Sequence, residues 1–369
     1  MTASPSSLRA IAALMALGLC SAAHAQSSVQ ISGRIDLAAR RVDNGPDTQN
    51  QLVREGARSS KLSIQANEDL GGGLSAGVVL EMQVRADNGT SASTFWERQS
   101  LVRLRGPFGE LRLGRDFALQ NSIGGDFDAL NGKGVGNMMN MATPFNFSNT
   151  NTYTRVNNAV SYLTPNWQGV YAQLQLAPSE GTTGNRHVAA GLFYVQPGTE
   201  ARATWGRTKV NSVGRVNALT GVSRAVAAEG EFDYAGLGLS HDFGPVRLLG
   251  SYLFWRSAQE VATGQRRFQR NLNLGAMVPV GAAGSVNLAW TGADRSGLGS
   301  DDQDGRQLAV QYVHKLSKRT LLYTSWARLS QSALAAADTA SSGARYNVDG
   351  TTLLGRTGGG IDAGIVHAF

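Results

Sequence analysis

The chain has 369 residues, 42% of them hydrophobic, and a formal net charge of +7 at pH 7. Its one cysteine, Cys20, lies near the N-terminus, so disulfides play no part in the fold of the later residues. Beyond that segment no apolar run reaches the roughly eighteen residues that a membrane-spanning helix needs. A basic excess is typical of proteins that bind nucleic acid, an anionic surface or anions in a cavity.

The first 25 residues predict a secretory signal peptide. Arg9 is the only charge before residue 25, residues 11–20 are apolar, and residues 23–25 form a small-x-small cleavage site. The mature chain is then residues 26–369, and export argues against nucleic acid as a partner. Cys20 raises the alternative of a lipoprotein, which Leu19 disfavours because lipidation signals need a small residue at that position.

From residue 28 onward, segments with alternating apolar and polar residues recur between turn-forming sequences. Seven separators are short, and most are rich in Gly, Pro or Asn, which supply a positive φ or a fixed bend. They are residues 70–73, 106–109, 164–169, 197–199, 243–245, 281–284 and 317–318. Eight longer polar stretches alternate with them, near 41–57, 87–94, 118–154, 178–185, 212–227, 259–265, 296–304 and 332–354. Seven short turns and eight long loops join sixteen strands.

Short connections on one side and long ones on the other are typical of an up-and-down membrane barrel. In Val102-Arg103-Leu104-Arg105 charged and apolar residues alternate, so they face opposite ways and the charges need a water-filled lumen. Aromatic residues near segment ends resemble interfacial girdles: Tyr162, Trp167, Tyr171, Trp205, Trp255, Tyr312, Tyr323 and Trp326. We predict an all-β, 16-stranded antiparallel transmembrane β-barrel without a convincing helix. A soluble secreted all-β protein is the alternative, because alternation cannot tell lipid from a protein core.

The last nine residues predict the strand that closes this barrel. Ile361, Ala363, Ile365 and His367 share one largely apolar face, and the opposite face carries Asp362 with small groups. A closed barrel must bring this last strand back to its first.

Five motifs in the right order resemble the general-diffusion porins of β-proteobacterial outer membranes. They are residues 28–33 (SVQISG), 67–74 (NEDLGGGL), 108–116 (FGELRLGRD), 162–167 (YLTPNW) and 316–323 (LSKRTLLY), followed by the terminal His-Ala-Phe. The resemblance implies a homotrimer in the outer membrane, among lipid and lipopolysaccharide, that lets small hydrophilic solutes and ions diffuse passively. It also implies a barrel-assembly machinery that reads Phe369, and an inward-folded third external loop.

The residues of the longest connection, 118–154, support such a loop. Five glycines allow sharp bends, and Met138, Met139, Met141 and Phe145 can pack against a wall. A compact barrel would expect a shorter connection. The alternative is a flexible external loop.

By the same resemblance, the pore constriction takes its charge from Lys61, Arg98 and Arg155 on the wall, with Glu81 close by. Family members are often anion-preferring and usually carry arginine at position 61, so Lys61 keeps the charge but loses the bidentate fork. Arg34 is a further candidate. Asp126 and Asp128 would supply an opposing negative side from the loop. The alternative for each is a solvated residue without a special role.

No catalytic activity, cofactor or metal site is predicted. The mature histidines are scattered, and Asp301-Asp302-Gln303-Asp304-Gly305 lacks the spacing and closing Glu of a calcium loop. Three other functions remain open: a substrate-specific channel for phosphate or organic acids, a barrel enzyme, and an adhesin that binds through its long loops.

Overall fold

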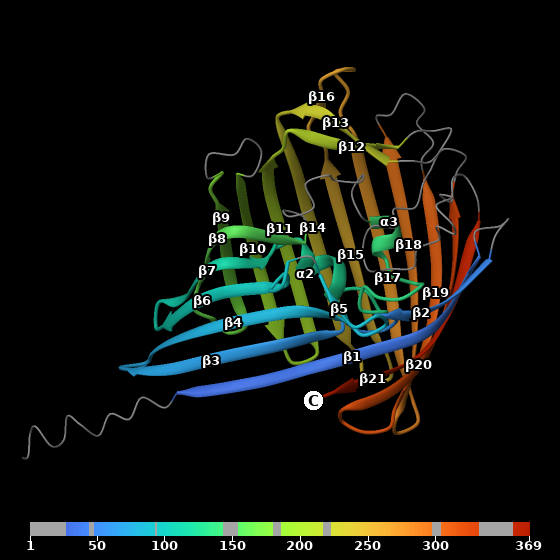
Figure 1. Ribbon diagram of the computed structural model, residues 1–369, viewed down its shortest axis with the longest axis horizontal. Helices are drawn as coiled ribbons and strands as arrows, with labels where there is room; N and C mark the ends of the chain where they lie inside the picture. The colour runs from blue at the N-terminus through green and yellow to red at the C-terminus, as the bar shows by residue number, and fades with distance from the viewer. Residues whose placement is uncertain are drawn as a thin grey trace, which may run out of the picture.

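The computed structural model describes residues 27–43, 48–92, 94–142, 154–179, 186–216, 223–296, 304–331 and 357–369. Long antiparallel strands in these ranges form one closed barrel, drawn in Figure 1. The barrel closes where β1 (Ser28–Asp43) pairs with β21 (Gly358–Ala368), from Arg34 opposite Ala368 to Asp43 opposite Gly359. The predicted closure by the last strand is therefore confirmed.

Sixteen strands of the described residues make the wall, which confirms the predicted fold class. Between β1 and β21 they are β3 (Lys61–Gly71), β4 (Leu74–Arg85), β6 (Gln99–Gly106), β7 (Gly109–Phe117), β8 (Arg155–Leu163), β9 (Val170–Ala177), β10 (His187–Gln196), β11 (Thr199–Lys209), β14 (Glu231–Asp242), β15 (Arg247–Arg256), β17 (Phe268–Val280), β18 (Gly284–Ser296), β19 (Gly305–Lys315) and β20 (Thr320–Gln331). Five shorter strands lie in the connections: β2 (Thr48–Arg54), β5 (Thr90–Ser91), β12 (Ser212–Val216), β13 (Ser223–Glu229) and β16 (Gln259–Glu260).

The short connections fall where the turn residues predict them. Gly71, Gly72 and Gly73 have φ of 80°, 60° and 79° between β3 and β4, a backbone conformation that favours glycine. Each of the other six predicted short turns also joins two consecutive wall strands. All short turns thus lie at one end of the barrel and all long connections at the other.

The two faces of the wall differ as the alternation predicts. On β17, Leu272 and Leu274 are 42% and 51% exposed, whereas Asn271 and Asn273 are 1% and 0% exposed. The outer face is therefore apolar and the inner face polar. The last strand follows the same rule, because Ile361 and Ile365 point outward and Asp362 is buried.

Two predicted loops prove to be largely strand. Within residues 41–57, β1 continues to Asp43 and β2 pairs with it, from Asp43 opposite Thr48 to Leu37 opposite Arg54. Within residues 212–227, β12 pairs with β13, and β13 also pairs with β16. Both stretches are polar because they lie at the long-loop end of the barrel, where a strand need not present an apolar face to lipid.

The prediction that the chain has no convincing helix is wrong for two short segments. They are α2 (Asn121–Asp126) and α3 (Met139–Ala142), both in the longest connection. Among the described residues, no helix is long and apolar enough to span a membrane. The predicted signal peptide, Phe145 and the acidic stretch 301–303 lie outside the described residues.

Three of the aromatic residues predicted for the interfacial girdles face inward instead: Tyr171, which stacks on the buried Phe193, and also Trp255 and Tyr323. Trp255 is 1% exposed and stacks on Phe232, with ring centroids 5.6 Å apart. Tyr323 is 4% exposed, and its hydroxyl donates a 2.5 Å hydrogen bond to Asp36 Oδ1. Aromatic residues near strand ends can pack on either face, so their position along the strand did not distinguish the two. Trp205 and Trp326, 44% and 41% exposed, do face outward.

Candidate functional site

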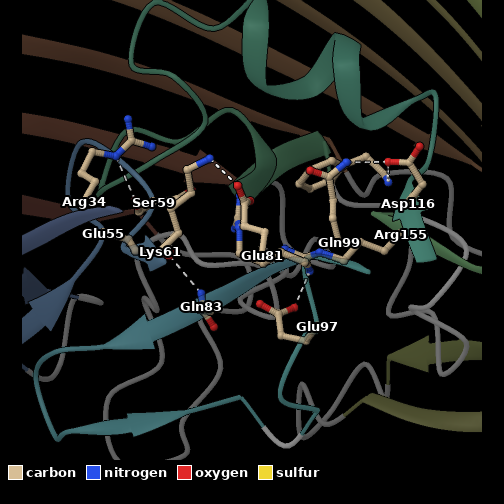
Figure 2. A network of polar contacts seen from close by, with 12 residues as sticks. Arg34, Glu55, Ser59, Lys61, Glu81, Gln83, Glu97, Gln99, Asp116 and Arg155 are labelled. Carbon is tan, nitrogen blue, oxygen red and sulfur yellow. Dashed lines mark hydrogen bonds and ion pairs between the residues drawn. The ribbon is translucent and has the colours of Figure 1, made fainter. Parts of the chain in front are cut away.

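Three neighbouring strands bring Lys61, Glu81 and Arg98 together on the inner wall. Figure 2 shows Lys61 beside Glu81. Lys61 begins β3, Glu81 lies in β4, and Arg98 immediately precedes β6. The Glu81 carboxylate accepts from Lys61 Nζ at 2.5 Å and from Arg98 Nε at 2.6 Å. Glu81 is 4% exposed, whereas the Lys61 side chain is 32% exposed. One buried acid therefore holds two cations, and one of these remains accessible to water.

Arg155 joins this group across the ring of Phe117. Phe117 ends β7 and lies opposite Arg155 in the sheet. The guanidinium carbons of Arg98 and Arg155 each lie 5.5 Å from the ring centroid, a cation–π distance. Arg155 Nη1 also lies 3.1 Å from Glu97 Oε2. The four wall residues that the family resemblance singled out thus belong to one cluster, here called the basic cluster: Lys61, Glu81, Arg98 and Arg155.

Further charges lie beside the basic cluster. Arg34 Nε donates to the Ser59 carbonyl oxygen at 3.0 Å. The Glu55 carboxylate accepts from Gln83 Nε2 at 2.9 Å and from Lys133 Nζ at 3.1 Å. Burial lowers the pKa of Lys133, and the like charges of Arg98 and Arg155 act in the same direction, while Glu55 opposes them. Lys133 therefore lies close enough to the basic cluster to interact with its charges.

The described part of the longest connection, residues 118–142, is fastened to the inner wall through its backbone. The Gly134 amide donates to the Glu55 carbonyl at 3.2 Å, and the Val135 amide donates to Asp362 Oδ2 at 3.0 Å. Asp362 is itself paired with Arg40 at 2.6 Å. Glu55 directly follows β2, which pairs with β1, and Asp362 lies in the closing strand β21, so both anchors lie near the barrel closure.

Amide side chains on the opposite wall hold the carbonyl groups of the same segment. Asn273 Nδ2 donates to the Phe127 carbonyl at 2.7 Å, and Asn271 Nδ2 donates to the Met141 carbonyl at 3.0 Å. Gln307 Nε2 donates to the Gly136 carbonyl at 2.8 Å. A buried connection must have its polar backbone groups satisfied, and these wall amides meet that requirement.

Apolar side chains complete the attachment of residues 118–142. Ile123, Phe127 and Met138 are fully buried in one cluster with side chains of β10, β14 and β15, and Met141 is fully buried in a second cluster. The methionine pattern of the sequence therefore does correspond to packing against the wall.

The two loop acids lie in different environments from each other. Asp126 forms an ion pair with Arg202 of β11, and Arg202 also lies 5.3 Å from the Phe127 ring centroid. Asp128 is 3% exposed and accepts from the backbone amides of Leu130, Gly132 and Met138 at 3.0, 3.2 and 3.0 Å. Complete burial raises the pKa of Asp128 to about 6, against the lowering effect of these three amides. Asp128 thus holds the fold of its own segment, and its burial argues against a charge presented to the channel.

The C-terminal Phe369 seals the junction between the first and last strands. Its amide and carbonyl exchange hydrogen bonds of 3.0 Å with those of Gly33. A Cβ at Gly33 would come within 2.3 Å of Phe369 Cζ, so the ring lies directly on the glycine. Only a residue without a side chain fits beneath this ring.

Sequence reasoning missed Glu55, Lys133 and Phe117. Glu55 and Lys133 are 78 residues apart, and nothing in their local sequence pairs them. Phe117 ends a predicted strand, but its contact with two arginines depends on the register of β7 and β8. In the part of the chain that the structure describes, no group of three or more His, Cys, Asp or Glu could hold a metal ion.

The family model for Gram-negative porins matches residues 10–334. The chain belongs to this family. Outer membrane porin protein 32 of Delftia acidovorans is 31% identical over 98% of this chain and 99% of its own length. An outer membrane porin protein of Bordetella pertussis is 27% identical over 85% of this chain and 91% of its own.

Solved structures agree with the family assignment. The anion-selective porin from Comamonas acidovorans is 30% identical, with a TM-score of 0.78 over 93% of this chain and 100% of that one. OmpT of Vibrio cholerae, in its trimer form, is 13% identical with a TM-score of 0.70 over 93% and 99% of the two chains, and shows the fold alone. This porin is therefore an outer-membrane protein of a Gram-negative bacterium.

Proposed function

We propose that this porin prefers anions among the small hydrophilic solutes and ions that diffuse through it, and that it catalyses no reaction and needs no cofactor. The observation that carries the proposal is the basic cluster, in which three cations, Lys61, Arg98 and Arg155, form ion pairs with two acids, Glu81 and Glu97. A pore selects ions through the charges that line it. The anion-selective porin from Comamonas acidovorans supports the same preference.

Residues 118–142 are the part of the chain that we propose narrows the channel. Their backbone is bound to wall residues on both sides, near Glu55 and Asp362 on one side and near Asn273 and Gln307 on the other. Lys133 of this segment pairs with Glu55, which ties the segment to the region beside the basic cluster. Solutes would pass between the segment and the basic cluster.

The anion preference should be moderate. Glu81 binds two of the three wall cations, and Lys61 offers a point charge without the planar fork of a guanidinium. Charges roughly 10 Å apart across a wet lumen interact by well under 1 kcal/mol. Selectivity would then arise from the summed field of several residues.

The assembled state we propose is a homotrimer, surrounded by outer-membrane lipid and lipopolysaccharide. The trimer form of OmpT supports a trimer through a shared fold. Phe369, packed on Gly33 with its side chain at the barrel surface, is accessible to an assembly machinery that reads the C-terminus.

The test is the reversal potential of the purified protein in a planar bilayer under a salt gradient. An anion-selective sign, with conductance linear in salt, would support a general-diffusion pore. Conductance that saturates would favour the alternative of a channel specific for phosphate or organic acids. A cation-selective sign would contradict the proposed role of the basic cluster, and the absence of step conductance would contradict the channel itself.

A further inference from the structure

The side chain of Phe117 lies between two arginines of the basic cluster. Phe117 is the last residue of β7, which pairs with β6 on one side and with β8 on the other. Arg98 immediately precedes β6, and Arg155 is the first residue of β8 and lies opposite Phe117. The order of the strands in the sheet therefore brings one aromatic ring and two guanidinium groups together.

The two guanidinium groups contact the same ring although their charges repel each other. Both guanidinium carbons lie 5.5 Å from the ring centroid of Phe117, so they cannot be farther apart than twice this distance. Each arginine has an acid of its own. Glu81 pairs with Arg98 at 2.6 Å, and Glu97 pairs with Arg155 at 3.1 Å. The ring is the group that both arginines share, and its negative face attracts each of them.

An aromatic ring has an effect on these cations that an acid in its place would not have. A carboxylate that bridges two cations cancels part of their charge, as Glu81 does for Lys61 and Arg98. The ring has no net charge, so it attracts two guanidinium groups and removes none of their charge from the lumen. An aliphatic side chain of similar size would fill the space without this attraction.

The backbone fixes the position of the ring. The Phe117 amide donates to Asp116 Oδ1 at 2.7 Å, and the Phe117 carbonyl accepts from Gln175 Nε2 at 3.0 Å. The next amide, that of Ala118, donates to the Thr154 carbonyl at 3.1 Å. An arginine side chain rotates about several bonds, whereas the ring is held by a backbone that is bonded to its neighbours. The ring therefore sets the place of the guanidinium groups.

We propose that Phe117 is a positioning residue for ion selection, whose ring holds Arg98 and Arg155 together as one doubly charged group on the channel wall. The inference rests on the proposed anion preference and names the residue that concentrates its charges. Two charges held in one place act on a passing ion together, whereas two side chains that swing apart act at different points along its path. The selectivity of a pore depends on the charges that line it at close range.

Reversal potentials of the purified protein in a planar bilayer test this role. Phe117→Leu removes the aromatic face, and Phe117→Tyr keeps it. We expect Phe117→Leu to lower the anion-to-cation permeability ratio roughly twofold in about 0.1 M salt, and Phe117→Tyr to retain most of the ratio. The effect of Phe117→Leu should shrink in about 1 M salt, where the field of the arginines is screened within about 3 Å. Phe117→Met, a second variant without a ring, should behave like Phe117→Leu.

A second background separates positioning from a general effect on the fold. If the ring acts through the two arginines, Phe117→Leu should not lower the permeability ratio further in the Arg98→Gln/Arg155→Gln variant. Step conductance of each variant shows that its barrel is folded.

Phe193→Leu is the matched control on the inner face of β10. The Phe193 ring centroid also lies 5.8 Å from a guanidinium carbon, that of Arg202. Arg202 is held by two acids, Glu200 and Asp126, so it does not depend on the ring for its position. The permeability ratio of Phe193→Leu should therefore equal that of wild type.

Three results would overturn the role of Phe117. The first is a wild-type permeability ratio in both variants without a ring. The second is an equal loss in Phe117→Leu and Phe117→Tyr, which would assign the effect to shape. The third is a further loss in the background that lacks both arginines. A wild-type channel without anion preference would contradict the proposed function alone, because a shift of Phe117→Leu toward cations relative to wild type would still support the role of the ring.

Discussion

The two sides of the barrel interior use polar residues in different ways. On the side of β3, β4, β6 and β8 the wall carries ion pairs, such as Glu81 with Lys61 and Arg98. On the side of β17 and β19 it carries neutral amides, such as Asn273 and Gln307, that bond to the backbone of residues 118–142. Buried neutral amides can satisfy backbone carbonyls without a counter-charge, whereas charged side chains need one or need water. The connection therefore packs closely on the neutral side, and charge remains available on the other.

The largest expected effect comes from removing Asp128, which organises the packed segment. Asp128→Ala leaves three buried backbone amides without their acceptor and should destabilise the fold of residues 118–142 by roughly 3 kcal/mol or more. Limited proteolysis and single-channel conductance measure this, and we expect faster cleavage in this segment and larger, noisier steps.

Asp126→Ala is the control for this variant. Asp126 is in the same segment, but its side chain is 55% exposed and makes one ion pair with Arg202. Its loss should cost less than about 1 kcal/mol. Equal effects of the two substitutions would contradict the role of Asp128 in folding the segment.

The pH dependence of the segment should be the next largest effect. Burial raises the pKa of Asp128 from its ordinary value of 3.8 to about 6, so the folded segment binds a proton more tightly than the unfolded one. The stabilisation is fully present below about pH 4 and is lost as the pH rises through 6, by roughly 1–3 kcal/mol. Protection from proteolysis should therefore increase from pH 7 to pH 5. Asp128→Asn should abolish this trend, and a trend that persists would assign it to another group.

A smaller effect is expected when the charged side loses its cations. Arg98→Gln/Arg155→Gln removes both guanidinium groups over Phe117 and should lower the anion-to-cation permeability ratio several-fold, or roughly 1 kcal/mol. Reversal potentials under a salt gradient measure the ratio. Arg270→Gln makes the same kind of change on the outer face and should leave the ratio unchanged. If the double variant were as anion-selective as wild type, the basic cluster would not be the cause of the anion preference.

The smallest effect is expected from the acid that balances the basic cluster. Glu81→Gln removes one negative charge but also releases Lys61 and Arg98 from their fixed positions. The anion preference should rise, by roughly twofold, because the lost charge outweighs the lost positioning in a wet lumen. A fall in the permeability ratio would mean that Glu81 acts mainly by holding the two cations in place.

Much of the fold could be predicted because its causes are local. Turn residues such as Gly71–Gly73 mark the hairpins, and alternation along β21 distinguishes the outer Ile361 and Ile365 from the inner Asp362. The polar composition of residues 48–54 predicted a loop, but these residues form β2. A strand beyond the hydrocarbon layer needs no apolar face. Position along the strand misled for Trp255 and Tyr323, because only the register decides which face each side chain takes.

The candidate site was predictable only in part. Resemblance to porins named Lys61, Glu81, Arg98 and Arg155 as one group, and the sheet register does bring them together. It could not foresee that Asp128 is buried in its own segment or that Lys133 pairs with Glu55. Those contacts depend on how the chain folds in space, and no local sequence pattern around these residues predicts them.

The sequence by itself determined a sixteen-stranded barrel with an apolar outside, a polar inside, and an end that meets its beginning. Side-chain alternation and turn chemistry act over a few residues, so they can be recognised without knowing what lies nearby in space. Tertiary structure alone decided which charges are paired. Asp233 pairs with Arg207 and Arg256, whereas Arg306 and Arg328 lie opposite glycines, and this difference depends on the register of separate strands. Ion pairs across a sheet depend on distances of a few ångströms, which the whole closed barrel sets.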